Sequence, residues 1–131
     1  MKITSSAISL NVADVAASAE FVKKHFGFSE SMSVEGTVSS LTREDAGFNL
    51  IYLRTGLDSF KPKHLAANAK EGLLIVFVVE NIDAEYQRLQ TEGVAVVTPI
   101  ETEPWGERYF QVEDPNGVII QLVQWVTPPA P

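Results

Sequence analysis

The chain has no cysteine and only two histidines among its 131 residues. Without cysteine it forms no disulfide, no thiolate metal site and no cysteine nucleophile, and either redox compartment remains open. Basic residues are also few, with ten Lys and Arg against seventeen Asp and Glu and a formal net charge of −7. This balance argues against nucleic acid as a partner, because nucleic-acid binding rests on basic side chains, and it favours cationic small molecules.

Long hydrophobic runs are missing as well. No stretch of about eighteen apolar residues could cross a bilayer, and the N-terminal residues enter a strand pattern without the apolar region of a signal peptide. We therefore expect a cytoplasmic protein with no membrane partner. The apolar share of 45% and the charged share of 21% are typical of a globular protein. A chain of 131 residues is long enough for one domain with its own core.

The same order of patterns occurs twice along the chain. Residues 7–12 alternate apolar and small or polar side chains, which predicts a half-buried strand, and a helix is predicted between the N-cap Asp14 and Gly27. In the second half, an apolar strand over 73–79 precedes a helix that begins after Asn81. The offset between Asp14 and Asn81 is 67 positions, and it also superimposes the flanking apolar residues of the two halves.

Each predicted helix is followed by a short strand and a hairpin. The expected segments are 29–34, 38–43 and 48–53 in the first half, and 94–98, 109–112 and 118–125 in the second. The turn Asp114-Pro115-Asn116-Gly117 suits a type I turn. The chain therefore predicts two βαβββ repeats in a single domain 1–131, with repeat one at about 5–55, a linker at about 56–71, repeat two at about 72–126 and a frayed tail at 127–131.

Several ordered motifs carry a resemblance to a known family. They are Leu10-Asn11-Val12-Ala13-Asp14, Phe26-Gly27-Phe28, Val79-Glu80-Asn81-Ile82, and Pro104-Trp105-Gly106-Glu107-Arg108-Tyr109-Phe110 ahead of the 114–117 turn. With the repeat, the chain resembles the vicinal oxygen chelate superfamily of glyoxalases, extradiol dioxygenases and bleomycin-resistance proteins, most closely its antibiotic-binding branch. The resemblance implies an α+β fold in which a mixed sheet curls around a cavity with helices on the outer face. It also implies a homodimer.

Enzymes of that superfamily hold a divalent metal with His, Glu or Gln side chains at four positions. The resemblance and the internal repeat place these positions at Ala7, Ile51, Leu74 and Gln121. Three of the four side chains have no donor atom, and a lone amide oxygen binds a divalent ion weakly. We therefore expect no metal and no cofactor. His25, at the end of the first helix, is expected to be solvated there, and His64 is expected on the surface of the linker.

Because side chains alternate along a strand, the four metal positions would share a face with mostly apolar side chains and a few amides. Such a face suits a flat organic ligand. Trp105 stands between a stiff proline and a permissive glycine, where its ring could stack on an aromatic or cationic ligand. The alternative is that Trp105 fills space between the halves and that the aliphatic residues pack a core or an interface. The predicted ligand-binding residues are Asn11, Asn49, Ile51, Tyr52, Phe60, Leu74, Trp105, Gly106 and Gln121.

The sequence thus favours a metal-independent binding protein over an enzyme. The expected partner is a small hydrophobic or cationic aromatic ligand, such as an antibiotic that the protein sequesters. The alternative is a metal-dependent enzyme of the glyoxalase or dioxygenase type with displaced ligands, such as Glu44, His64, Glu101 or Glu103. A third possibility is a catalytically idle regulator or scaffold.

Overall fold

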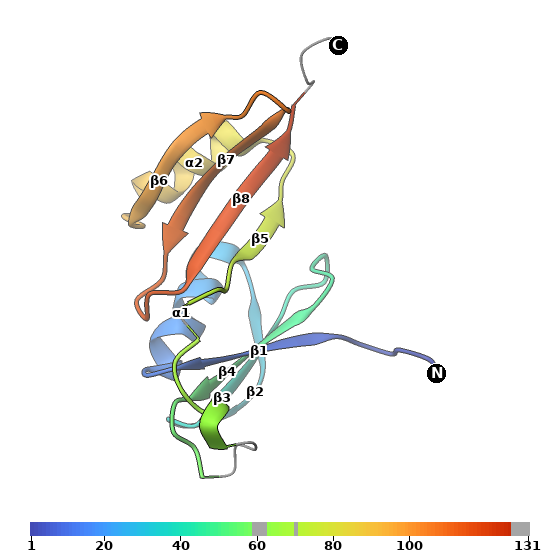
Figure 1. The fold of residues 1–131 in the computed structure, drawn as a ribbon, viewed down its shortest axis with the longest axis vertical. Coiled ribbons are helices and arrows are strands. Elements are labelled where there is room, and N and C mark those ends of the chain that lie inside the picture. Colours follow the sequence, from blue (N-terminus) through green and yellow to red (C-terminus); the bar gives the residue numbers. More distant parts are fainter. Residues whose placement is uncertain (59–62, 70, 127–131) are drawn as a thin grey trace. The chain divides into compact units, whose positions relative to one another are not determined.

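The computed structural model describes residues 1–58, 63–69 and 71–126, and the chain divides into two compact units, Met1–Ala69 and Lys70–Pro131 (Figure 1). Each unit contains one α-helix and one four-stranded mixed sheet. The boundary between the units falls in the stretch predicted as the linker. Two predictions, the frayed tail 127–131 and the ligand-binding role of Phe60, fall outside the described residues.

The described residues of unit 1 form β1 (Ala7–Val12), α1 (Val15–Phe26), β2 (Ser29–Val34), β3 (Val38–Thr42), β4 (Asn49–Arg54) and the short 3-10 helix η1 (Lys63–Leu65). The strand order is β1-β4-β3-β2. β1 and β4 run parallel, with Ser9 opposite Ile51, and the other neighbours are antiparallel. Helix α1 packs against β3, β4 and β2, so one face of the sheet is covered by the helix.

Unit 2 repeats this arrangement with five elements: β5 (Ile75–Val78), α2 (Ile82–Thr91), β6 (Val96–Thr102), β7 (Glu107–Glu113) and β8 (Ile119–Trp125). The strand order is β5-β8-β7-β6, and β5 and β8 form the parallel pair. Helix α2 packs against β7 and β8. The two βαβββ repeats predicted from the sequence are therefore confirmed.

The strand limits differ from the prediction in unit 2. The apolar strand expected over 73–79 is shorter, at Ile75–Val78, and the strand expected over 94–98 lies further along, at Val96–Thr102. Pro99 has no N–H to donate to a neighbouring strand, so it would be expected at a strand end or at an irregularity. It falls in an irregularity of the β6–β7 register between Thr98 and Glu101, and pairing continues beyond it.

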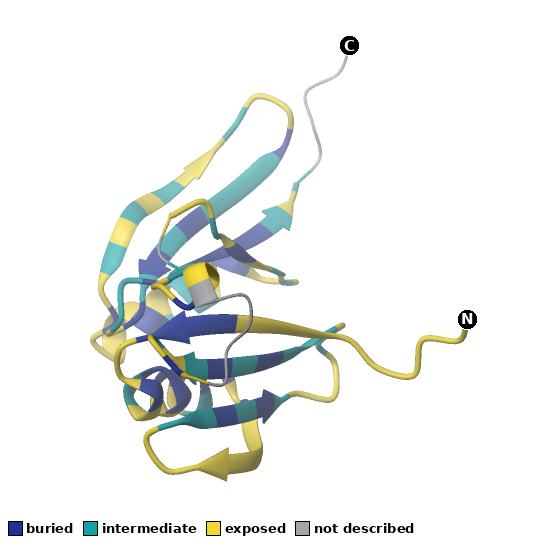
Figure 2. Cartoon of the chain, turned by 60° about the horizontal axis from the view of Figure 1, so that its bottom comes forward, coloured by how far each residue is buried: buried dark blue, intermediate teal, exposed yellow. Residues whose placement is uncertain are grey.

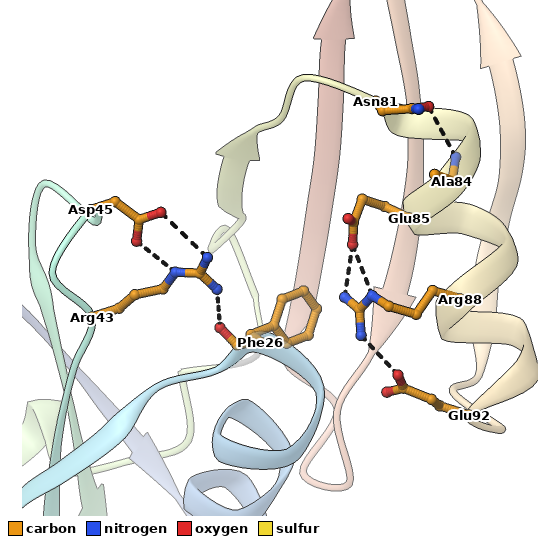
Figure 3. A network of polar contacts seen from close by, with 8 residues as sticks. All are labelled: Phe26, Arg43, Asp45, Asn81, Ala84, Glu85, Arg88 and Glu92. Carbon is orange, nitrogen blue, oxygen red and sulfur yellow. Dashed lines mark hydrogen bonds and ion pairs between the residues drawn. The ribbon is translucent and has the colours of Figure 1, made fainter.

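Side-chain caps fix the ends of helix α1. The Asp14 carboxylate accepts a hydrogen bond from the backbone N–H of Ala17 at 3.1 Å, and Gly27 adopts the left-handed conformation with φ 67° that ends the helix. Arg43 of the β3–β4 turn donates to the terminal carbonyl of Phe26 and forms an ion pair with Asp45 (Figure 3). Both caps agree with the sequence prediction, whereas the Arg43 contact depends on tertiary structure.

The prediction that His25 is solvated is wrong. Only 9% of this side chain is exposed, and its ring lies 5.0 Å from the ring of Phe21 in an edge-on geometry. Four residues separate the two positions, so both lie on one side of helix α1. The two lysines that precede His25 pointed to a polar helix end, but the helical period puts His25 on the buried stripe with Val22 and Phe26.

Burial alternates along the strands of both units (Figure 2), as expected for a sheet with one face under a helix. The residues on the helix side are almost fully buried: Leu10, Val12, Leu41, Leu50 and Tyr52 in unit 1, and Ile75, Phe110, Val112, Ile120 and Leu122 in unit 2. The opposite surface of each sheet is called the helix-free face below. This face holds the predicted site residues that lie on strands, except Tyr52.

Candidate functional site

The helix-free face of unit 2 combines apolar, amide and acidic side chains. Cross-strand pairing places Val76 of β5 beside Gln121 of β8, and Gln121 beside Gln111 of β7. Because side chains alternate along a strand, every second residue shares this face. Its members are Val76, Val78, Glu107, Tyr109, Gln111, Glu113, Ile119, Gln121, Val123 and Trp125. The face is apolar along β5 and β8 and acidic along β7.

Gln121 lies at the centre of this face and is the last of three hydrogen-bonded polar side chains, called the polar chain from here on. Its Oε1 accepts a hydrogen bond from Nε2 of Gln111 at 2.9 Å, and Oε1 of Gln111 accepts one from the Thr98 hydroxyl at 2.7 Å. The Gln121 side chain is only 8% exposed. No described residue accepts a hydrogen bond from its Nε2, so this N–H₂ group is available to a ligand.

Trp105 stands at the end of the same sheet, in the loop between β6 and β7. Its side chain is 59% exposed. Gly106 beside it is buried, has φ 98°, donates to the Glu103 carbonyl at 2.9 Å and accepts from the N–H of Val126 at 2.8 Å. Trp125, 57% exposed, pairs with Glu107 across β7 and β8. The backbone thus brings two exposed indole rings to one end of unit 2.

The net charge of the protein lies entirely in unit 2. Residues 1–69 carry seven basic and seven acidic side chains, whereas residues 70–131 carry three basic and ten acidic ones, a difference of −7. Arg88 is held between Glu85 and Glu92 (Figure 3), and Arg108 pairs with Asp83. Among the described residues, no basic side chain pairs with the glutamates of the β6–β7 edge, which are Glu101, Glu103, Glu107 and Glu113. This edge therefore attracts cations.

Tyr109 lies on β7 two residues before Gln111, and its hydroxyl contacts the acidic edge. Its hydroxyl lies 2.7 Å from Oε1 of Glu101 and 3.2 Å from Oε1 of Glu103. The hydrogen bond to Glu101 raises the pKa of Tyr109, and partial burial and the negative charges of both carboxylates act in the same direction. The phenol thus remains a hydrogen-bond donor well into the alkaline range.

Replacing Glu101 should lower the pKa of Tyr109. In Glu101→Gln we expect that pKa to fall towards the ordinary value of about 10 for a tyrosine, because the amide carries no charge. Because the pKa of Tyr109 is higher in the folded state than in the unfolded state, the contact with Glu101 stabilises the protein below pH about 10. This stabilisation is lost as the pH rises through the folded-state pKa. Absorbance titration of the phenolate, with Tyr109→Phe identifying the signal, measures the shift. Glu107→Gln on the same face is the control, and equal titration curves for Glu101→Gln and wild type would contradict the assignment.

The predicted site residues of unit 1 lie on both sides of its sheet. Ile51 and Asn49 are half-buried on the helix-free face, and Asn49 also borders an open depression with Gly27 and Arg43. Tyr52, predicted to bind the ligand, is instead fully buried under α1. Neighbouring strand residues face opposite ways, so Ile51 and Tyr52 cannot line one surface. Asn11 is buried, and its Nδ2 donates to the carbonyls of Leu65 at 2.9 Å and Ala67 at 3.1 Å.

The four positions that the resemblance assigns to a metal do not fit one. Ala7 and Leu74 are exposed, Ile51 is half-buried, and none of the three has a donor atom. Gln121 has one, but its Oε1 already accepts from Gln111. Divalent ions need several N or O donors converging on one point. Elsewhere in the described residues, no group of three His, Asp or Glu side chains gathers in a way that could hold a metal.

Sequence reasoning missed Thr98 and Gln111 as part of this site. Gln111 lies three residues before Asp114 and Gln121 three residues after Val118, and the two glutamines pair across the hairpin. Counting outward evenly from Asp114 and Gly117 would have paired Gln121 with Phe110, so Gln111 could be found only once the hydrogen bond between Asp114 and Val118 was known. Thr98 is different, because its pairing with Gln111 follows an irregular register between β6 and β7 that no sequence pattern marked.

A duplicated βαβββ unit with a helix-free face of this kind defines a class of small-molecule binding proteins and enzymes. The chain belongs to the Glyoxalase/Bleomycin resistance protein/Dioxygenase superfamily, whose match covers residues 4–122. Nothing in this match distinguishes one branch of the superfamily from another.

Individual relatives support the same fold. The structure of lactoylglutathione lyase from Agrobacterium tumefaciens is similar with a TM-score of 0.74, 14% identity and 94% of both chains covered. TioX from Micromonospora sp. ML1 has a TM-score of 0.74 and 19% identity, over 95% of this chain and all (100%) of TioX. The uncharacterized protein Mb0911c of Mycobacterium bovis is 44% identical over 43 residues, which span 33% of this chain and 28% of Mb0911c.

Within the described residues, neither α-helix has the length and hydrophobicity that a membrane span requires.

Proposed function

We propose that the chain is a metal-independent binding protein that sequesters a flat aromatic compound with a positive charge, as an antibiotic-resistance protein would. The observation that carries this proposal is the helix-free face of unit 2, where a hydrogen-bonding amide lies on an apolar floor beside an acidic edge. Apolar surface holds the ring system, and a few polar groups orient it. The glutamates of the β6–β7 edge attract its charge.

Two further features support a cationic aromatic ligand. Trp105 and Trp125 expose their rings at the same end of the sheet, and indole faces attract both aromatic rings and cations. All of the net negative charge lies in the unit that carries them. We further propose that the protein acts in the cytoplasm and, on the strength of the family resemblance, that it forms a homodimer.

Calorimetric titration with two related acridines tests the proposal. At pH 7 the 9-aminoacridine ring system is cationic, whereas acridine itself is mostly neutral. We expect the wild type to bind 9-aminoacridine more tightly, with an affinity that falls as salt rises. Failure of both compounds to bind, together with no thermal stabilisation by other planar cationic drugs, would contradict the proposed function.

The Trp105→Ala variant locates the site. Removing one aromatic wall that also contacts a cation should weaken 9-aminoacridine binding about tenfold. Trp105→Phe is the matched control, since it keeps a ring and should retain most of the affinity. An unchanged affinity in Trp105→Ala, in protein that remains folded by circular dichroism, would remove Trp105 from the site.

A second candidate function is a metal-dependent enzyme of the glyoxalase or dioxygenase type with displaced ligands. The observation that favours it is the convergence of the Glu101 and Glu103 carboxylates on one point, the Tyr109 hydroxyl. Elemental analysis of purified protein separates the two candidates. A stoichiometric divalent metal whose removal by chelator abolishes a measured activity would favour the enzyme and overturn the metal-independent proposal.

A further inference from the structure

The polar chain on the helix-free face of unit 2 has an unusual property: its direction can be reversed. In one arrangement the Thr98 hydroxyl donates to Gln111, and Gln111 donates to Gln121. This arrangement leaves the N–H₂ group of Gln121 as its free end. The positions of the heavy atoms do not fix this direction, because the oxygen and nitrogen of an amide are nearly equal in size.

The reverse arrangement keeps the same number of internal hydrogen bonds. If both amides turn over, Gln121 donates to Gln111 and Gln111 donates to the Thr98 oxygen. A hydroxyl group serves as donor or acceptor, so Thr98 satisfies both directions. The free end is now the carbonyl oxygen of Gln121. The two arrangements differ in whether Gln121 offers a donor or an acceptor, and in whether the Thr98 hydroxyl donates to Gln111 or accepts from it.

The surroundings of Gln121 make that difference important to a ligand. Val76 lies beside it on β5, and Ile119 and Val123 flank it on β8. None of these side chains can hydrogen-bond, and Gln121 is 8% exposed. A ligand group that meets the wrong end of the amide there would remain unpaired in an apolar setting, which is costly.

We propose that Thr98, Gln111 and Gln121 form a reversible hydrogen-bond relay that lets one site accept two classes of aromatic ligand. One class presents an acceptor, such as an aromatic carbonyl compound, and the other presents a donor, such as an N–H heteroaromatic. The relay rests on the proposed function, since it concerns the same face. Thr98 and Gln111 are positioning residues. They determine whether Gln121 presents its N–H₂ group or its carbonyl oxygen to the ligand.

The Gln111→Glu variant fixes the direction of the hydrogen bonds in the relay. At pH 8 the new carboxylate is ionised and can only accept, so Gln121 must turn its N–H towards it and offer its oxygen outward. Acetophenone, an acceptor, and indole, a donor, are titrated by ¹H–¹⁵N NMR. We expect the wild type to bind both, and Gln111→Glu to keep indole binding while losing about tenfold in acetophenone affinity.

Gln87→Glu is the matched control, because it adds the same charge at an exposed position of α2 in the same unit. It should leave the ratio of the two affinities unchanged. An unchanged ratio in Gln111→Glu as well would overturn the relay. Absence of binding by both compounds to the wild type would also overturn the relay, and 9-aminoacridine binding by the same protein would show that the proposed function still stands.

A second measurement needs no ligand. Thr98→Val removes the hydroxyl at the far end, and we expect it to shift the side-chain NH₂ resonances of both Gln111 and Gln121, whereas Thr98→Ser should restore them. A shift confined to Gln111 would overturn the relay, since the change would then not pass along the chain. This result is independent of whether any compound binds.

Discussion

Phe110→Ala is expected to lower the free energy of unfolding by about 3–5 kcal/mol, the largest effect of any single substitution considered for this chain. Phe110 is 0% exposed on β7, and its ring meets that of Tyr86 of α2 edge-on at 4.8 Å. It pairs with Leu122 of β8. Alanine would remove the ring that joins helix to sheet in unit 2 and leave a cavity.

Urea denaturation followed by circular dichroism measures this change. Phe110→Leu is the matched control, because it retains much of the buried apolar volume, and it should cost less than about 2 kcal/mol. A loss below about 1 kcal/mol in Phe110→Ala would contradict the packing described here, since a side chain in a well-packed core cannot be truncated so cheaply.

Asn11→Ala should have the second largest effect, a loss of about 2–4 kcal/mol in the free energy of unfolding. Both hydrogens of its Nδ2 are used, on the carbonyls of Leu65 and Ala67, and its main-chain carbonyl, which alanine would keep, accepts from the N–H of Ala69 at 3.1 Å. Removing the amide leaves two carbonyls without their donor. Asn11 thus ties strand β1 to the chain that follows β4.

The same variant tests whether Asn11 has a structural role or contacts the ligand. If it is a structural residue, Asn11→Ala lowers stability and leaves the affinity for 9-aminoacridine unchanged in the folded protein. The matched control is Asn49→Ala, which truncates the same side chain where it is only half-buried and should change stability by less than about 1 kcal/mol. Weaker binding at unchanged stability would make Asn11 a ligand contact.

The fold was largely predictable because its signals are local. The cap at Asp14, the end of α1 at Gly27 and the cap at Asn81 follow from side-chain chemistry within a few residues. The repeat then supplied the order of elements along the chain by analogy between the halves. The strand limits around Pro99 were missed, because an irregular register depends on the neighbouring strand.

The candidate site was only partly predictable. Gln121 follows from its place after the 114–117 turn, and Trp105 from its position between Pro104 and Gly106. The partners of these residues come from other strands, so the amide chain through Gln111 and Thr98 required the actual register. The roles of His25 and Asn11 depend on what packs against them, which composition and spacing do not reveal.

The parallel pairing of first and last strands also bears on how the chain folds. Ala7 pairs with Asn49 in unit 1, and Ile75 pairs with Ile120 in unit 2. Each pairing waits until nearly a whole unit has been synthesised and must close a long loop, which is slow. Among the strands of the described residues, each pairs only with strands of its own unit. Duplication therefore lengthens the protein without lengthening the loops that its sheets must close.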